Sequence, residues 1–254
     1  MNPLRRAVSL SPSFTEILQA LGEGANLAGV TDHCPQDLAG ACRIGSPKAL
    51  RLEEIARLAP DIVLADRNEN RPEEVRVLEK KFRVVSFDVR SVPAAVDAVA
   101  GLGRLFEKKE AAEKIVKDIL AEQEANRKAA EGAAPVRTLI LLWHQPYLTV
   151  NFDTYISRLV EGAGGRNVFH EDPIREFPVE LEDMIERDPE RLLLAAEPFS
   201  FRKNHRAGFR KYRIFSKIPI DLVDGRLFSR FGPRTAEALR TLRRLILEGA
   251  VHAQ

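Results

Sequence analysis

Two stretches of the sequence repeat one pattern: RLEEIARLAPDIVLAD at 51–66 and ELEDMIERDPERLLLAA at 180–196. Each combines a short amphipathic helix, a proline and a hydrophobic run of strand length. When Pro60 is aligned with Pro189, the triplet LEE before the first proline falls on the triplet LED before the second. A leucine followed by two acids is also common in unrelated helices, but the shared order favours two similar α/β lobes in one chain.

Short runs rich in Val, Ile and Leu alternate with helical patterns in both halves of the chain, which predicts parallel sheets covered by helices. In the first half we expect strands at 6–10, 27–31, 61–65 and 83–87, and helices at 14–21, 51–58 and 71–81. In the second half we expect strands at 138–144, 191–196 and 218–223, and helices at 153–163, 180–187 and 233–248.

The segment between the two halves is rich in Ala, Glu, Lys and Leu. Apolar residues recur at helical spacing from 105 to 131, which predicts one helix of roughly 25 residues, about 40 Å long. It could lie on the surface of one lobe, but its length and position favour a connector. We therefore predict two α/β lobes with parallel sheets and a ligand cleft between them. The predicted division is an N-terminal lobe at 1–104, a backbone helix at 105–132 and a C-terminal lobe at 133–254.

The composition is that of a soluble globular protein, with 44% hydrophobic and 30% charged residues. The 39 basic and 37 acidic residues are mixed along the chain, unlike the clustered basic residues of nucleic-acid-binding proteins. No stretch approaches the ~18 apolar residues of a membrane span. We expect neither nucleic acid as a partner nor a membrane-spanning chain. No secretory signal is visible, which predicts a cytosolic protein unless a leader or lipid anchor has been removed.

Several polar groups follow the expected strands. The loop SLSPSFTEI contains a capping box of Ser13 and Glu16, which predicts a helix start with free backbone N–H groups for an acceptor-rich ligand. The same motif often only caps a helix. His33 and His144 follow strands in opposite lobes and could converge, either as polar pocket residues or to reach a metal inside a ligand. Because the histidines lack HxxH spacing, we predict no metal site made by the protein alone.

Aromatic residues are only 7% of the chain, yet they are concentrated in loops that follow strands of the second half. Because such loops open on one edge of a parallel sheet, we predict a single aromatic wall, with about half of its members facing a ring-rich ligand. The candidates are Trp143, Tyr147, Phe177, Phe199, Phe201, Phe228 and Phe231.

The whole chain resembles the helical-backbone (class III) substrate-binding proteins of ABC importers, especially the cobalamin and ferric-siderophore binders. The resemblance extends over about 1–248 and is carried by VSLSPSFTEILQALG, GVTDHCP, IGSPKALRLEEIARLAPDIVLA, TYISRLVEGAGGRNVF, FPVELEDMIERDPERLLLA and FGPR. It implies two Rossmann-like lobes joined by one long interlobe helix, with a ligand held between them and little hinge motion. Cobalamin binders often carry tryptophans on the first lobe, whereas this sequence has Pro47 and Asp66 there.

The resemblance and the aromatic loops together give a set of expected ligand contacts. They are Ser11, Pro12, His33, Pro47, Asp66, Trp143, His144, Tyr147, Phe177, Phe199, Phe228 and Arg230. The resemblance also implies that a glutamate on each lobe docks onto the permease, and the matching positions are Glu73 or Glu74 and Glu182. Solvated helix acids are the alternative interpretation of these three.

The favoured hypothesis is therefore a non-catalytic binder of a bulky metal chelate, namely cobalamin, a related corrinoid, a ferric siderophore or haem. No cofactor is expected apart from that ligand. We expect a monomer that serves an ABC permease dimer, located in the periplasm or tethered to the cell surface by family resemblance. The alternatives are an intracellular corrinoid or metal-chelate binder, a chelatase-type enzyme that uses His33 and His144, and a binder of bare metal ions.

Overall fold

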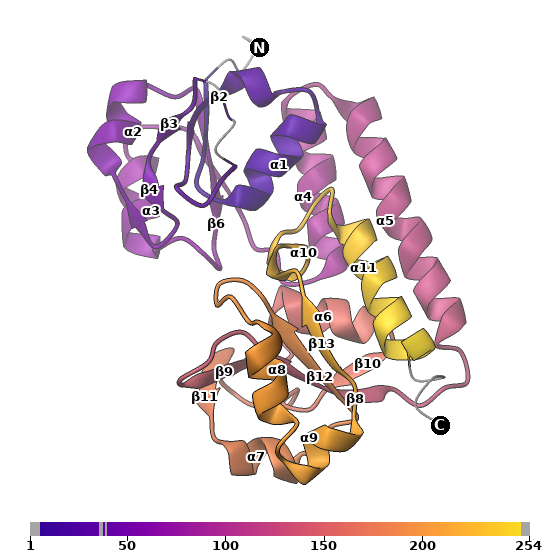
Figure 1. The fold of residues 1–254 in the computed structure, drawn as a ribbon. Coiled ribbons are helices and arrows are strands. Elements are labelled where there is room, and N and C mark those ends of the chain that lie inside the picture. Colours follow the sequence, from indigo (N-terminus) through magenta and orange to yellow (C-terminus); the bar gives the residue numbers. More distant parts are fainter. Residues whose placement is uncertain (1–5, 36–37, 39, 250–254) are drawn as a thin grey trace. The chain divides into compact units, whose positions relative to one another are not determined.

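The computed structural model describes residues 6–35, 38 and 40–249 (Figure 1). The chain forms two compact units: unit 1 comprises Met1–Val89 and Pro93–Lys117, and unit 2 comprises Arg90–Val92 and Asp118–Gln254. The boundary between Lys117 and Asp118 falls inside the helix Lys109–Ala129, which therefore contributes to both units. The cleft expected between the lobes stays a prediction.

Unit 1 is built on a five-stranded parallel sheet with the strand order β3-β2-β1-β6-β7. Its strands are β1 (Ala7–Ser9), β2 (Leu27–Val30), β3 (Cys42–Arg43), β6 (Ile62–Asp66) and β7 (Val84–Phe87). Its helices are α1 (Pro12–Ala20), α2 (Leu52–Leu58), α3 (Pro72–Glu79) and most of α4 (Val92–Leu105), with a short 3-10 turn at Gly24–Asn26. A small antiparallel hairpin joins β4 (Gly45–Ser46) to β5 (Ala49–Leu50).

Unit 2 contains a four-stranded parallel sheet with the order β10-β8-β12-β13 and a separate antiparallel pair, β11-β9. Its strands are β8 (Val136–Leu141), β9 (Tyr147–Val150), β10 (Gly165–Asn167), β11 (Glu176–Val179), β12 (Arg191–Ala195) and β13 (Ile220–Val223). Its helices are α6 (Tyr155–Gly162), α7 (Leu181–Glu186), α8 (Lys203–Phe209), α9 (Arg213–Lys217), α10 (Gly225–Ser229) and α11 (Thr235–Arg243), which continues as a π-helix over Arg244–Glu248. The predicted α/β class with two parallel sheets is confirmed.

The repeated sequence pattern forms the same structure twice. In unit 1, α2 leads into β6, and in unit 2, α7 leads into β12. The residue before each proline has a left-handed backbone, with φ of 44° at Ala59 and 45° at Asp188. Each helix inserts one fully buried side chain, Ile55 or Met184, toward its sheet. The equivalence of these elements supports the interpretation of the repeat as two related lobes.

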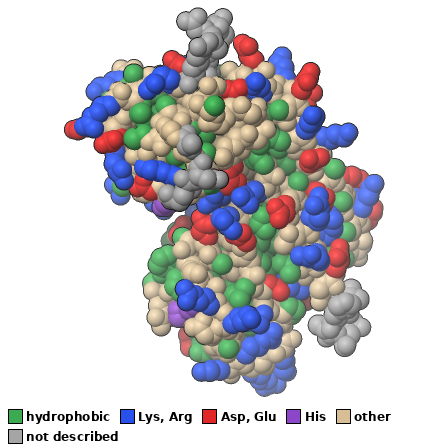
Figure 2. All heavy atoms as spheres, turned by 45° about the horizontal axis from the view of Figure 1, so that its top comes forward, with side chains coloured by type: hydrophobic (Ala, Val, Ile, Leu, Met, Phe, Trp, Pro, Cys, Tyr) green, Lys and Arg blue, Asp and Glu red, His purple; other side chains and the backbone are tan. Residues whose placement is uncertain are grey.

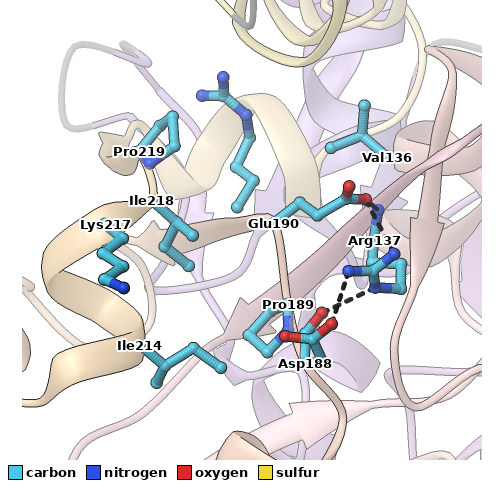
Figure 3. Close-up of a pocket in the computed structure, with 10 residues that line it drawn as sticks. Val136, Arg137, Asp188, Pro189, Glu190, Ile214, Lys217, Ile218 and Pro219 are labelled. Atoms are coloured by element: carbon cyan, nitrogen blue, oxygen red, sulfur yellow. Dashed lines mark hydrogen bonds and ion pairs between the residues drawn. The ribbon is translucent and has the colours of Figure 1, made fainter. Parts of the chain in front are cut away.

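In both copies of the repeat, an arginine at the start of the neighbouring strand bonds the chain that links the helix to the strand. The backbone N–H of Arg6 donates to the carboxylate of Asp61 at 3.1 Å, and that of Arg137 donates to Glu190 at 2.8 Å. Both guanidinium groups also donate through Nε to a backbone carbonyl: that of Leu58, the last residue of α2, at 2.9 Å, and that of Asp188, two residues after α7, at 2.7 Å. Figure 3 shows the second copy, in which Arg137 also pairs with the Asp188 carboxylate at 2.8 Å.

The connecting helix is shorter than predicted. The structure has α4 up to Leu105 and then α5 (Lys109–Ala129, 21 residues), about 30 Å long. The expected start at 105 is wrong because the backbone N–H of Lys108 bonds the carbonyl of Gly103 at 2.7 Å and Glu107 is left-handed, which ends α4. A Cβ at Gly103 would lie 2.3 Å from that of Ala112, so the glycine allows the two helices to pack closely.

The C-terminal half of α5 packs beside α11 in unit 2 (Figure 1). The amide of Asn126, which is fully buried, donates to the carbonyl of Leu239 at 3.2 Å. Glu122 binds Arg240 at 2.7 Å and Arg243 at 2.9 Å. Burial opposes ionisation of Glu122, but the two arginines outweigh it and lower the pKa of this carboxyl. This half of the helix is therefore an integral part of unit 2.

Charges on the surface are mixed. On the face that Figure 2 shows, Lys and Arg side chains lie among Asp and Glu side chains. Among the described residues, no helix is both long enough and apolar enough to cross a membrane.

Candidate functional site

In unit 1 the carboxyl end of β1 leads directly into α1. Ser11 is the N-cap of this helix, and its hydroxyl accepts from the backbone N–H of Ser13 at 3.4 Å. The predicted capping box of Ser13 and Glu16 is therefore wrong. Pro12 occupies the first helical position, where its fixed φ and missing N–H are tolerated, so the helix starts two residues earlier than that motif implies.

Hydroxyl groups connect the start of α1 to β1. Thr15 donates to the Ser9 hydroxyl at 2.9 Å, and Ser9 donates to the carbonyl of Ser11 at 2.7 Å. The Ser13 hydroxyl, which is also buried, has no hydrogen-bond partner among the described residues. This edge of unit 1 is therefore rich in small, buried polar groups.

Asn70, which is not among the predicted site residues, connects the segments that meet at this edge by hydrogen bonds. Its amide nitrogen donates to the carbonyls of Leu10 at 2.9 Å and Pro47 at 3.1 Å. Its amide oxygen accepts from the backbone N–H of Asp66 at 2.8 Å. Because the side chain is only 4% exposed, these bonds are shielded from water and join the ends of β1 and β6 to the β4-β5 turn. Two of the predicted site residues, Pro47 and Asp66, are thereby brought together.

His33 is exposed in the loop that follows β2. The loop is held by Arg43, whose guanidinium donates to the carbonyls of Thr31 and Cys34 at 3.0 Å each. His33 and His144 belong to different units, so their predicted convergence stays a prediction.

In unit 2, rings gather in an aromatic–histidine cluster. Its members are Trp143, His144, Tyr147, Phe199, Phe201 and His205. Ring centroids are 5.4 Å apart for Trp143 and Phe199, 5.2 Å for His144 and Tyr147, 4.9 Å for Phe199 and Phe201, and 5.0 Å for His144 and His205. Most of these rings are half-buried, and Trp143 is 37% exposed. The cluster therefore presents part of its ring surface to solvent.

The topology of the sheet explains why these rings meet. Strands β8 and β12 are parallel neighbours, so the loops that follow them open on the same edge. The chain after β8 folds back as a tight turn, in which the N–H of Leu142 bonds the carbonyl of Leu148 at 2.9 Å and Gln145 has a φ of 65°. The loop after β12 supplies the phenylalanines, and α8 supplies His205. His205 is not among the residues that the sequence predicted for the site.

The two histidines differ in the hydrogen bonding of their ring nitrogens. Burial lowers the pKa of His144, and the neighbouring His205 lowers it further, so the imidazole is neutral at neutral pH. His205 accepts a hydrogen bond at Nδ1 from the backbone N–H of Arg202 at 2.9 Å. In the neutral ring this bond assigns the proton to Nε2.

The predicted aromatic wall is divided. Phe177, on β11, packs edge-on against Phe169 at 5.6 Å within the core of unit 2. Phe228 is 1% exposed, and Phe231 is also buried, with its ring 6.1 Å from that of Tyr155. These three rings lie among core residues, whereas the other four of the seven candidates belong to the aromatic–histidine cluster. Ligand contact by Phe177 and Phe228 stays a prediction.

Arg230 is buried and binds the carboxylate of Glu197 at 3.3 Å, so the chain after α10 is tied to the loop after β12. A Cβ at Gly225 would lie 2.3 Å from the backbone nitrogen of Glu197, and only glycine allows this close approach. The ion pair and the close packing at Gly225 therefore both restrict the loop that carries Phe199.

The predicted docking acids are not equivalent. Glu74 is half-buried and accepts from the backbone N–H of Leu50 at 3.3 Å, so its carboxylate has a structural role. Glu73 and Glu182 are exposed in the first turns of α3 and α7. The structure therefore favours Glu73 over Glu74 as a free surface carboxylate.

A pocket of about 350 Å³ lies at the amino ends of β8 and β12, away from the cluster (Figure 3). Arg137 lines it together with Asp188 and Glu190, which neutralise its guanidinium. Among the described residues, no group of three or more His, Cys, Asp or Glu could hold a metal ion. The aromatic–histidine cluster is therefore the stronger candidate for a ligand contact surface.

Comparisons with known proteins agree with this architecture. A family model described as "Periplasmic binding protein" matches residues 8–219. The vitamin B12-binding protein of Pectobacterium carotovorum subsp. carotovorum (strain PC1) is 28% identical over 239 residues, which are 91% of this chain and 84% of that protein.

Solved structures share the fold. The periplasmic vitamin B12 binding protein of Vibrio cholerae matches with a TM-score of 0.85 at 21% identity and covers 98% of this chain and 99% of its own. The periplasmic heme-binding protein RhuT from Roseiflexus sp. RS-1 matches with a TM-score of 0.80 at 22% identity, over 99% and 100%. Because the family model matches well over half of the residues, the chain belongs to the periplasmic binding protein family.

Proposed function

We propose that this protein is the substrate-binding component of an ABC-type importer and that its ligand is a bulky, ring-shaped metal chelate of the cobalamin or haem class. The observation that carries the choice of ligand is the aromatic–histidine cluster at the carboxyl edge of the unit 2 sheet. The names of the similar proteins, which bind vitamin B12 or haem, support it.

The chemistry of the cluster suits such a ligand. Macrocycles have large apolar faces, which gain from contact with partly exposed rings such as Trp143 and Phe199. Neutral His144 adds a nitrogen that can accept a hydrogen bond or bind a metal.

The proposal includes a place of action and a partner. The protein works in the periplasm or tethered at the cell surface, as the names of the similar proteins suggest. It acts as a monomer without a resident cofactor, and it delivers its ligand to a permease dimer through Glu73 and Glu182. Both carboxylates are exposed, as docking requires.

Isothermal titration calorimetry with cyanocobalamin, haem and a ferric siderophore tests the ligand class. At a ligand concentration of 100 times Kd, binding stabilises the native state by about 2.7 kcal/mol, so a parallel thermal unfolding series should show the same preference. Absence of binding and of stabilisation with all three chelates would rule out the proposal. Conversion of the chelate, such as release or insertion of its metal, would favour the chelatase-type alternative instead.

A reconstituted transport assay tests the docking role. Charge reversal by Glu73→Lys and Glu182→Lys should reduce ligand uptake and leave ligand affinity unchanged, because these carboxylates lie outside the cluster. Glu113→Lys is the control, since Glu113 is an exposed acid on α5 and lies outside the sequence repeat. Unchanged uptake in both docking variants would refute this part of the proposal.

A further inference from the structure

His144 lies in the aromatic–histidine cluster without a polar partner. Its ring packs against Tyr147, Phe199, Phe201 and His205, with centroid distances between 5.0 and 6.5 Å. Within the part of the chain that the structure describes, neither ring nitrogen makes a hydrogen bond. Polar groups withdrawn from water normally have such a partner, so this half-buried imidazole offers a free electron pair.

His205 differs from His144 in the availability of an electron pair on its ring nitrogens. Its Nδ1 is occupied by the backbone N–H of Arg202, and its Nε2 carries the proton. Binding a metal through either nitrogen would require loss of that hydrogen bond or a change of tautomer. Of the two neighbouring histidines, His144 is therefore the one with an available electron pair.

The surroundings argue against a bare ion as the guest. No set of three or more metal-ligating side chains occurs in the ranges that the structure describes. A bare ion at His144 would lack the further protein ligands that it needs. A metal inside a macrocycle arrives with its equatorial positions filled and requires only an axial ligand, and imidazole is a common ligand of first-row transition metals.

We propose that His144 binds the central metal of the chelate as an axial ligand, so that the protein prefers chelates with an exchangeable axial position. This inference rests on the proposed function. In the step itself, the bond between the metal and an axial water breaks, and the imidazole nitrogen donates its electron pair to the metal. One neutral ligand replaces another, so the oxidation state and the total charge stay the same and no proton is transferred.

Two probes of nearly the same shape separate this role from simple packing. Aquocobinamide carries exchangeable water at the axial positions of cobalt, whereas dicyanocobinamide holds cyanide there. Visible absorption spectra and affinities are measured for the full chain with each probe. We expect a spectral shift on binding of aquocobinamide, no shift with dicyanocobinamide, and about tenfold tighter binding of the aquo form.

The decisive variant is His144→Phe, which keeps a ring in the cluster and removes both nitrogens. It should still bind dicyanocobinamide, which also shows that it is folded, but it should lose the spectral shift and the preference for the aquo form. His170→Phe is the matched control, because His170 lies in the same unit, is also half-buried and bonds Glu161 outside the cluster. It should keep both the shift and the preference.

Four outcomes would overturn the inference. Retention of the spectral shift in His144→Phe would exclude this residue as the ligand, and loss of the shift in His205→Phe alone would assign it to the neighbour. Binding of both probes by the wild-type chain without any shift would exclude axial ligation while leaving the proposed function intact. Binding of neither cobinamide, with ferric haem also giving no shift in its main absorption band, would remove the proposed function together with the inference.

Discussion

The carboxyl edges of the two sheets differ far more than the elements beneath them. Both units contain the same helix, left-handed residue, proline and strand, and in both an arginine on the neighbouring strand bonds the chain after the helix. Above this shared base, unit 1 ends in hydroxyls and a buried amide, whereas unit 2 ends in rings. The shared contacts at the amino ends of the strands stabilise the fold, whereas the loops at the carboxyl ends supply the residues that can contact a ligand.

The two edges also differ in how firmly their groups are held. Asn70 is almost fully buried, and its hydrogen bonds to Leu10, Pro47 and Asp66 are shielded from solvent. Trp143 and its neighbours contact each other through dispersion and keep exposed surface. We therefore expect changes in unit 1 to act mainly on stability, and changes in the cluster to act mainly on binding.

The largest expected effect tests the shared base. Ile55→Ala and Met184→Ala each remove a fully buried side chain at equivalent positions, and each should lower the free energy of unfolding by about 3 kcal/mol. Urea denaturation measures both, with Glu53→Ala and Glu182→Ala as exposed controls that change it little. A large cost in one unit and almost none in the other would contradict the structural equivalence of the copies.

The next effect sharpens the contrast at the edges. Asn70→Ala leaves the carbonyls of Leu10 and Pro47 without their donor and should lower the free energy of unfolding by about 2 kcal/mol. Asn68→Ala is the control, because Asn68 is less buried and its bonds are closer to solvent. Equal costs for the two asparagines would show that Asn70 does not hold this edge together.

A smaller effect is expected on affinity. Trp143→Ala should weaken chelate binding by about 1 kcal/mol, or about fivefold in Kd, because an aromatic contact is lost. The free energy of unfolding of the unliganded protein should hardly change, since the ring is 37% exposed. Calorimetry and urea denaturation of the same preparation separate the two quantities. A large loss of stability would make Trp143 a core residue rather than a contact residue.

The smallest effect concerns pH. Burial and His205 lower the pKa of His144 in the folded state below its ordinary value of 6.5, so the unfolded chain binds more protons at mildly acid pH. Stability contributed by this group is therefore present above that value and lost as the pH falls toward the folded pKa. The thermal midpoint should drop between about pH 7.5 and about pH 5.5, and less so in His144→Phe. An equal drop in both proteins would contradict the assignment.

The sequence predicted seven of the nine parallel strands among the described residues, because Val, Ile and Leu runs between turns leave few alternatives. It missed β3 and β10, which are only two and three residues long. It did not predict the β9-β11 pair, since YLTV is short and EFPV contains a proline, which an edge strand tolerates. The start of α5 was missed because the break at Glu107 arises from close packing at Gly103, and helical periodicity does not record such a contact.

The candidate site was predicted in part, because loops after neighbouring parallel strands must meet. This rule brought Trp143 and Phe199 together correctly. It could not distinguish Phe228, since the direction of a side chain in a loop depends on packing. Asn70 and His205 were missed for a related reason: an asparagine in a turn and a histidine in a short helix look like ordinary surface residues until their partners are known.

The missing side chain at position 225 limits how this binding surface can diversify. The backbone of Glu197 occupies the space that any Cβ would need, so every substitution there displaces the loop that carries Phe199. In a saturation library selected for new ligands, position 225 should return glycine alone while the exposed ring at 143 varies freely. New ligand specificities can therefore arise by substitution of the aromatic side chains, while Gly225 keeps the course of the loop backbone constant.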